Sequence, residues 1–181
     1  MIVLVCGPSG SGKTTLLTNI AMHTKNKIIE VIVSRNNPRT FSEYGKKEIS
    51  QLVFERIKGT FDHLYQYDDS VYGYALREEN VSITDYVFLD YPGEYPDCNE
   101  LKKIPWRGIV VLPPSKDELV TRLRLQRKEH RIPSAVEEYD AIIEELNDGK
   151  YPKQKWKVFY SRDAACMSDM ILDITHKRLF G

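Results

Sequence analysis

A glycine-rich stretch near the N-terminus, GPSGSGKT at residues 7–14, limits the fold of this chain more than any other feature. It fits the pattern G-x-x-x-x-G-K-[S/T] and directly follows the apolar run Ile2–Cys6, which is typical of a strand buried on both faces. Apolar residues at helical spacing predict a helix from about Lys13. A strand, a glycine-rich turn and a helix in this order predict a phosphate-binding loop in an α/β protein with a parallel sheet.

The residue types of this loop suit a nucleoside triphosphate bound with a metal ion. Glycines let backbone amides point inward at phosphate oxygens, and the positive end of the following helix favours the same anion. Lys13 would neutralise the terminal phosphates, and the Thr14 hydroxyl would complete a magnesium site. We therefore expect ATP and Mg²⁺ to bind at a loop made of Gly7, Pro8, Ser9, Gly10, Ser11, Gly12, Lys13, Thr14 and Thr15.

Asp90 is the expected second metal ligand. It ends the apolar run YVFLD at residues 86–90, and a carboxylate at a strand end beside a phosphate loop can hold magnesium through water. The alternative interpretation is a surface aspartate where a strand passes into a turn.

Most of the remaining chain alternates strands and helices. Apolar runs predict further strands at 28–33, 86–90, 108–112 and 157–160, and a last helix at 164–172. Ser115 and Ser134, each with a glutamate three residues on, form capping boxes that predict two more helices, the second ending near Gly149. Between residues 34 and 80 the pattern is irregular and rich in tyrosine, which indicates an excursion away from the main sheet.

Charge and cysteine content narrow the partners and the compartment. The 181 residues include 26 Lys and Arg and 26 Asp and Glu, so the formal net charge is zero and indicates neither nucleic acid nor an anionic membrane as a partner. Three widely spaced cysteines, Cys6, Cys98 and Cys166, are typical of reduced thiols. We expect a cytoplasmic protein whose partners are small-molecule nucleotides.

Four further segments follow the phosphate loop in a recognisable order. They are Ser34–Arg39 (SRNNPR), Tyr72–Tyr74 (YGY), Leu112–Ser115 (LPPS) and the basic cluster Arg127–Arg131. Together with GPSGSGKTTL they resemble the guanylate kinase family of nucleoside monophosphate kinases. The resemblance implies one P-loop kinase domain with a three-layer α/β fold over residues 1–181. Its core would be 1–33 and 83–181, with a monophosphate-binding insertion at about 34–82 and a lid at about 124–136.

This resemblance also implies roles for individual residues. The terminal phosphate of ATP would pass to a nucleoside monophosphate, with GMP or dGMP as the first expectation. Residues acting at the transferred phosphate would be Lys13, Arg39, Arg122, Arg127 and Arg131. Residues binding the acceptor would be Ser34, Arg35, Arg39, His63, Tyr72 and Tyr74.

The charge pattern supports these roles independently. Residues 116–131 carry six Lys or Arg against three acids, and phosphoryl transfer needs cations that approach from both sides. Arginine suits this role because its planar fork pairs two phosphate oxygens at once. A solvated helix face is the alternative interpretation of such a basic run.

The departures from the family fall on the acceptor side. Two residues separate Arg35 from Pro38, so either this segment holds an insertion or Asn36 takes the place of an arginine. Glu48 stands where the family has a phosphate-binding tyrosine, and His63 where it has a guanine-reading glutamate. Tyr74 replaces a small hydroxyl residue, and Pro92 replaces a second acid.

Three other functions therefore stay open. The acceptor could be another nucleotide, including a deoxynucleotide, or a small phosphorylated molecule. The chain could instead be a catalytically inactive guanylate-kinase-like module that binds a protein. An ATPase that does mechanical work is the third alternative, which the short chain disfavours.

Overall fold

The computed structural model describes residues 1–36, 45–67, 70–75, 86–91, 105–176 and 179–180. In chain order, their elements are β1 (Ile2–Cys6), α1 (Lys13–His23), β2 (Lys27–Ile28), β3 (Val31–Arg35), β4 (Lys46–Glu48), α2 (Gln51–Ile57), η1 (Lys58–Thr60), β5 (His63–Tyr67), β6 (Ser70–Tyr74), β7 (Val87–Asp90), β8 (Trp106–Leu112), α3 (Lys116–Leu125), η4 (Glu129–Arg131), α4 (Ile132–Asn147), β9 (Trp156–Tyr160) and α5 (Ala164–Thr175).

The first sheet is parallel throughout and has the strand order β2-β7-β1-β8-β9. Alternate residues of its central strand β1 point to opposite faces. Val3 and Val5 pack against α1 and α5, whereas Ile2 and Leu4 belong to a cluster with α4 and the second sheet. Burial on both faces explains why the run Ile2–Cys6 is apolar without alternation. The predicted α/β fold with a parallel sheet is confirmed.

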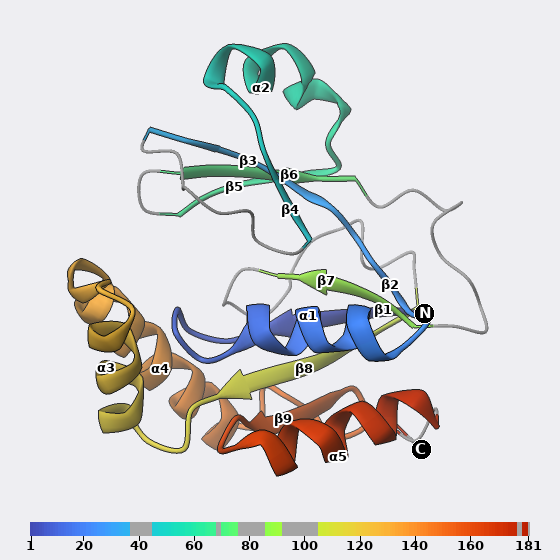
Figure 1. Cartoon of the computed structure of the whole chain (residues 1–181), viewed down its shortest axis with the longest axis vertical. Helices are drawn as coiled ribbons and strands as arrows, with labels where there is room; N and C mark the ends of the chain where they lie inside the picture. The colour runs from blue at the N-terminus through green and yellow to red at the C-terminus, as the bar shows by residue number, and fades with distance from the viewer. Residues whose placement is uncertain (37–44, 68–69, 76–85, 92–104, 177–178, 181) are drawn as a thin grey trace.

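A second sheet, β4-β3-β6-β5, lies over this core (Figure 1). Its strands β3 and β4 are parallel, while β6 is antiparallel to both β3 and β5. Helix α2 covers its outer side, where Phe54 packs against Phe61 with the ring centroids 5.5 Å apart. Its inner face shares one hydrophobic cluster with the first sheet, through side chains such as Val31, Val33 and Tyr74. The described residues of the irregular tyrosine-rich segment therefore contribute most strands of a second, mixed sheet and the helix α2 that covers it.

The predicted single strand at 28–33 is wrong. The chain leaves the first sheet after Ile29, whose amide donates to the Phe88 carbonyl oxygen at 2.7 Å. Two residues later, the Val31 amide donates to the Gly45 carbonyl oxygen of the second sheet at 2.8 Å. An apolar run records burial but not which strand provides the hydrogen bonds, so the change of sheet is invisible in the sequence. The division into core and insertion at residue 33 stays a prediction, and the second sheet already includes Val31–Arg35.

One of the two predicted helix caps is confirmed and the other is wrong by three residues. The Ser115 hydroxyl accepts a hydrogen bond from the Glu118 amide at 3.1 Å and caps α3. Helix α4 instead begins at Ile132, with a proline in its first turn, and the Ser134 hydroxyl donates to the Arg131 carbonyl oxygen. Proline suits the first turn because its missing N–H has no partner there in any case.

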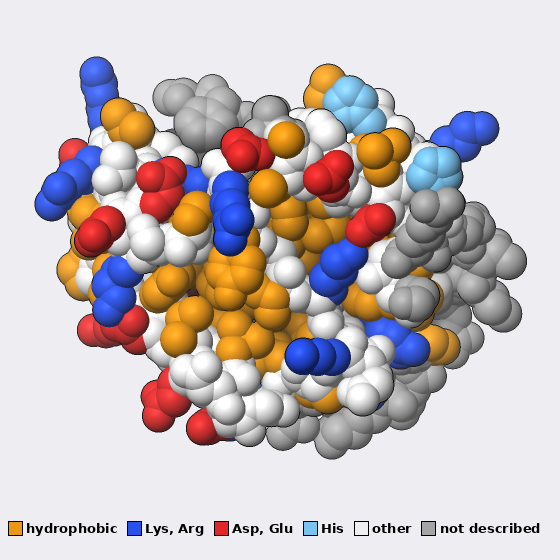
Figure 2. All heavy atoms as spheres, turned by 90° about the horizontal axis from the view of Figure 1, so that it is seen from below, with side chains coloured by type: hydrophobic (Ala, Val, Ile, Leu, Met, Phe, Trp, Pro, Cys, Tyr) orange, Lys and Arg blue, Asp and Glu red, His pale blue; other side chains and the backbone are white. Residues whose placement is uncertain are grey.

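Viewed from the side of β9 and α5, the molecule shows hydrophobic side chains gathered at the centre, with charges of both signs interspersed around them (Figure 2). Tyr160 on β9 and Leu172 on α5 are large apolar side chains that solvent reaches. Within the described ranges, no helix combines the length and the apolar character needed to cross a membrane.

Candidate active site

The phosphate loop connects β1 to α1 in a conformation that requires its glycines. Gly7, Gly10 and Gly12 have φ angles of 141°, 82° and 105°, which side chains rarely tolerate. A Cβ atom on Gly7 would lie 2.1 Å from the Val111 carbonyl oxygen of β8, so no larger residue fits. Such turns aim backbone amides into one concave site, and α1 begins at Lys13 directly behind it. The geometry suits an anion.

Two groups of the loop bond to polar atoms of the protein itself. The Lys13 ammonium donates hydrogen bonds to the carbonyl oxygens of Gly7 at 2.5 Å and Pro8 at 3.0 Å. The Ser9 amide donates to a carboxylate oxygen of Glu138, on α4, at 3.1 Å. Because a carboxylate is an anion, Glu138 takes a position at the loop that a phosphate oxygen could also take.

Lys13 lies in a strongly charged neighbourhood. Burial lowers its pKa from the ordinary lysine value, and Asp90 opposes this effect. Lys46 lowers the pKa further, whereas Glu138 raises it. A phosphate bound at the loop would favour the protonated lysine in the same way as the two carboxylates do.

Asp90 ends β7 beside this loop, as the sequence predicts. Its carboxylate is 9% exposed and forms an ion pair of 2.6 Å with the Lys46 ammonium, which comes from β4 of the second sheet. A cation therefore already sits against this carboxylate. Together with the Thr14 hydroxyl on the first turn of α1, Asp90 offers the hard oxygen donors that Mg²⁺ prefers, so these residues suit that metal.

Arg35 lies on β3 and is engaged by an acid of its own sheet. Its guanidinium pairs with the Glu48 carboxylate at 2.5 Å and lies 5.9 Å from the centre of the Tyr72 ring. Ser34, its neighbour, is buried. Glu48, which stands where the resembling family has a tyrosine, therefore neutralises the charge of Arg35, the arginine whose spacing to Pro38 departs from the family.

The predicted acceptor residues of β5 and β6 form one aromatic layer. Tyr65 and Tyr72 stack with centroids 4.8 Å apart, and the rings of His63 and Tyr74 are 5.3 Å apart. Tyr91, just after β7, faces both His63 and Tyr74 at 6.1 Å and 6.3 Å. Tyr74 is fully buried, so rings from both sheets meet where a glutamate and a small hydroxyl residue would stand in the resembling family.

Arg122 has a different setting from the one expected of a residue that acts at the transferred phosphate. Its guanidinium donates to the Ser161 hydroxyl at 2.8 Å and to the Ser161 carbonyl oxygen at 2.5 Å. The Ser161 hydroxyl in turn donates to the Ser11 carbonyl oxygen of the phosphate loop at 2.6 Å. On its other side, Arg122 pairs with Glu118 at 2.9 Å. Arg122 therefore connects α3 to the loop through Ser161.

The remaining predicted arginines are not brought to the loop by any described contact. Arg127 is exposed on the turn after α3, with a φ angle of 55°, and Arg131 ends η4. Arg39 and Pro92 lie outside the described residues.

Sequence reasoning missed three residues of the site: Lys46, Glu138 and Ser161. Lys46 follows a glycine in a short basic pair, which gave no signal of its own. Glu138 belongs to an acidic stretch that reads as a solvated helix face, and Ser161 is a single serine after a strand. Each contacts a partner more than 40 residues away in the sequence, so no local pattern could identify it.

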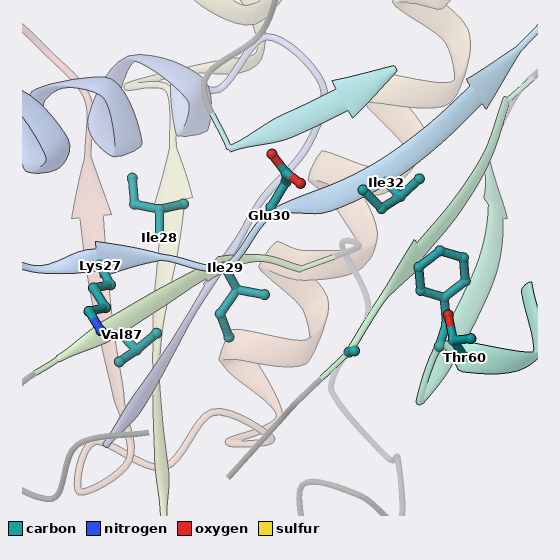
Figure 3. A pocket seen from close by; sticks show the side chains of 9 residues that line it. Lys27, Ile28, Ile29, Glu30, Ile32, Thr60 and Val87 are labelled. Atoms are coloured by element: carbon teal, nitrogen blue, oxygen red, sulfur yellow. The ribbon is translucent and has the colours of Figure 1, made fainter. Parts of the chain in front are cut away.

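A cavity of about 390 Å³ lies where the chain passes from one sheet to the other (Figure 3). Its lining is mainly apolar, and Ile28, Ile29 and Phe61 contribute to it. None of the phosphate-loop residues 7–15 lines this cavity. It therefore marks the junction of the two sheets rather than the phosphate site.

Sequence comparison connects the chain to named nucleotide-binding proteins. The family model for the CobW/HypB/UreG nucleotide-binding domain matches residues 1–68. The guanylate kinase of Mycoplasmoides gallisepticum is 28% identical over 160 residues, which cover 77% of this chain and 78% of that protein. The guanylate kinase of Wolbachia sp. subsp. Brugia malayi is 27% identical over 170 residues, covering 82% and 85%.

Structural comparison agrees with the sequence relatives. The crystal structure of guanylate kinase from Anaplasma phagocytophilum matches with a TM-score of 0.65 and 18% sequence identity. The match covers 100% of this chain and 87% of that one. The similarity extends over both sheets, not over the phosphate loop alone.

Proposed function

Because this chain is a divergent relative of the guanylate kinases, we propose that it transfers the terminal phosphoryl group of ATP to a nucleoside monophosphate. GMP and dGMP are the first acceptors to test. The observation that carries the proposal is the distribution of charge across the site. Lys13 and the loop amides follow β1 of the first sheet, while Arg35 and Lys46 lie on β3 and β4 of the second, and Lys46 is close enough to lower the pKa of Lys13. Transfer between two phosphates needs cations on both sides, because several negative charges meet in the transition state.

The residues of the chain have distinct roles in this proposal. The loop amides and Lys13 hold the transferred phosphoryl group and stabilise its developing charge. Thr14 and Asp90 would hold Mg²⁺, which neutralises charge on the terminal phosphates when it is bound. Arg39 grips the acceptor phosphate, and Arg35 joins it once the phosphate displaces the Glu48 carboxylate from the guanidinium. The acceptor oxygen is already anionic, so no side chain has to remove a proton from it.

The lid completes the site in the same proposal. Arg127 and Arg131, between α3 and α4, close over the phosphates and exclude water, which suppresses wasteful hydrolysis of ATP. Arg122 contributes by fixing the loop to which the nucleotide binds.

The contact between His63 and Tyr74 favours a second candidate, in which the acceptor is another nucleotide or a small phosphorylated molecule. Guanine presents two hydrogen-bond donors on its pairing edge, which a carboxylate can accept together. A neutral imidazole provides one acceptor at most, and a buried tyrosine ring fills space that a small residue would leave open.

The test is a coupled assay of ADP release across ribo- and deoxyribonucleoside monophosphates and phosphorylated sugars. Lys13→Ala serves as the inactive control, and Lys25→Ala, at an exposed lysine beyond α1, serves as the matched control. We expect Mg²⁺-dependent ADP release that requires an acceptor and disappears in Lys13→Ala alone.

Three results would contradict the proposed function, each in its own direction. ATP binding without transfer to any acceptor would favour an inactive binding module. Rapid ADP release without an acceptor would favour an ATPase. Equal activity of wild type and Lys13→Ala would place the chemistry outside the phosphate loop.

A further inference from the structure

Lys46 and Asp90 form an ion pair that bridges the two sheets beside the phosphate loop. Lys46 begins β4 in the second sheet, and Asp90 ends β7 in the first. The charged atoms are 2.6 Å apart, and the side chains are 16% and 9% exposed. The Lys46 ammonium also lies 5.7 Å from the centre of the Tyr72 ring, which Arg35 approaches at 5.9 Å. The pair therefore connects the donor side of the site to the acceptor side.

Stability alone does not explain a pair of this kind. Desolvation of two charges often cancels their attraction, so a buried pair is seldom better than apolar residues of similar volume. Here the pair involves the carboxylate that suits a divalent cation, and Lys46 is close enough to lower the pKa of Lys13. The Lys46 ammonium and a divalent cation would both neutralise the negative charge of Asp90, so they would compete for the same carboxylate.

We infer that Lys46 is a binding residue for the acceptor phosphate which alternates with a divalent cation at Asp90. With a divalent cation bound at Asp90, the Lys46 ammonium would lose this ion pair and turn to the phosphate between the two sheets. Metal binding at Asp90 would leave the pair of Arg35 with Glu48 in place, whereas it would release Lys46 from its ion pair. Metal binding thereby favours acceptor binding. The acceptor half of this inference rests on the proposed function, whereas the competition at Asp90 does not.

The first experiment measures the competition without any turnover. Calorimetric titrations of ATP at a series of Mg²⁺ concentrations are compared for wild type, Lys46→Met and Lys47→Met. Lys47 is the exposed neighbour on the same strand, so its substitution changes the net charge equally and leaves Asp90 untouched. We expect the half-saturating Mg²⁺ concentration to fall by about tenfold in Lys46→Met and to stay unchanged in Lys47→Met, because removing a competing ligand typically changes affinity by this order. Equal Mg²⁺ dependence of wild type and Lys46→Met would overturn the inference.

The second experiment measures the acceptor half. With the acceptor that gives the fastest ADP release, we expect the acceptor KM of Lys46→Met to rise by about tenfold or more, because a charge-assisted hydrogen bond to phosphate is lost. Lys46→Arg should recover part of this loss. A shift in Mg²⁺ dependence without a rise in KM would overturn the acceptor role.

Two further comparisons keep the test decisive. If Lys46→Met does not fold, Lys46→Gln replaces it, since its amide can still donate one hydrogen bond to Asp90. If no acceptor is phosphorylated, the proposed function fails, while the Mg²⁺ titration still decides whether Lys46 competes at Asp90.

Discussion

Arg122 offers the sharpest test of how the phosphate loop is held. The guanylate kinase resemblance implies that Arg122 acts at the transferred phosphate, whereas its contacts with Ser161 indicate a structural connection to the loop. Substitution by methionine keeps the length and the apolar stem of the side chain and removes the guanidinium. We expect Arg122→Met to destabilise the protein by about 2–4 kcal/mol, since two charged hydrogen bonds to Ser161 are lost.

The individual contacts account for this range. Hydrogen bonds to charged groups contribute about 1.5–3 kcal/mol each, and the two bonds to Ser161 share one donor group, so their sum is an upper bound. The pair with Glu118 adds about 0.3–0.5 kcal/mol, because that glutamate side chain is 44% exposed and solvent screens the attraction. For a chain of this size, 3 kcal/mol corresponds to a fall in Tm of about 6–12 °C.

Urea unfolding followed by circular dichroism measures the change, with Arg124→Met as the control. Arg124 lies on the same helix and is exposed, so its substitution should alter the unfolding free energy by less than about 0.5 kcal/mol. The Kd for ATP should rise by about tenfold in Arg122→Met alone, because the loop loses preorganisation. If Arg122→Met unfolds like wild type but loses most of its turnover, the structural explanation is wrong and a role at the transferred phosphate is the better one.

Three further predictions concern packing, proton linkage and thiol chemistry. Gly108→Ala should lower the unfolding free energy by about 3 kcal/mol or more, because the added Cβ would lie 2.0 Å from the Trp156 ring. Gly59→Ala, where the added Cβ meets open space, is the control and should change little in the same urea unfolding measurement. Equal stabilities of the two variants would contradict the packing described for β8 and β9. Burial lowers the pKa of Lys13 and a bound phosphate raises it again, so ATP binding should take up a proton and should weaken as the pH rises through the lowered pKa. Calorimetry in buffers of different ionisation enthalpy measures this uptake, and its absence at alkaline pH would refute the linkage. Burial also raises the pKa of the Cys6 thiol, so iodoacetamide followed by mass spectrometry should label Cys6 only after unfolding, and labelling in the native state would show that the thiol is accessible.

Local sequence patterns were sufficient to predict those elements whose defining contacts join residues close together in the chain. A strand, a turn and a helix follow one another directly in the chain, and the sequence specifies them by the apolar run Ile2–Cys6, the glycines of residues 7–14 and Lys13. The capping box at Ser115 is equally local, since its hydroxyl bonds an amide three residues away. These features were predictable because the bonds that define them span only a few residues.

Long-range partners decided the rest. The sequence shows that 28–33 is apolar, but hydrogen bonds to Phe88 and Gly45 divide it between two sheets. It shows that Arg35, Arg122 and Asp90 are charged, while their functional state depends on Glu48, Ser161 and Lys46. Whether a charged side chain is available to a phosphate depends on the neighbours that it meets in the fold. These neighbours come from distant parts of the chain: Glu48 lies in the same sheet as Arg35, Ser161 follows β9, and Lys46 reaches Asp90 from the other sheet. For that reason only the tertiary structure shows which ion pairs these charges form.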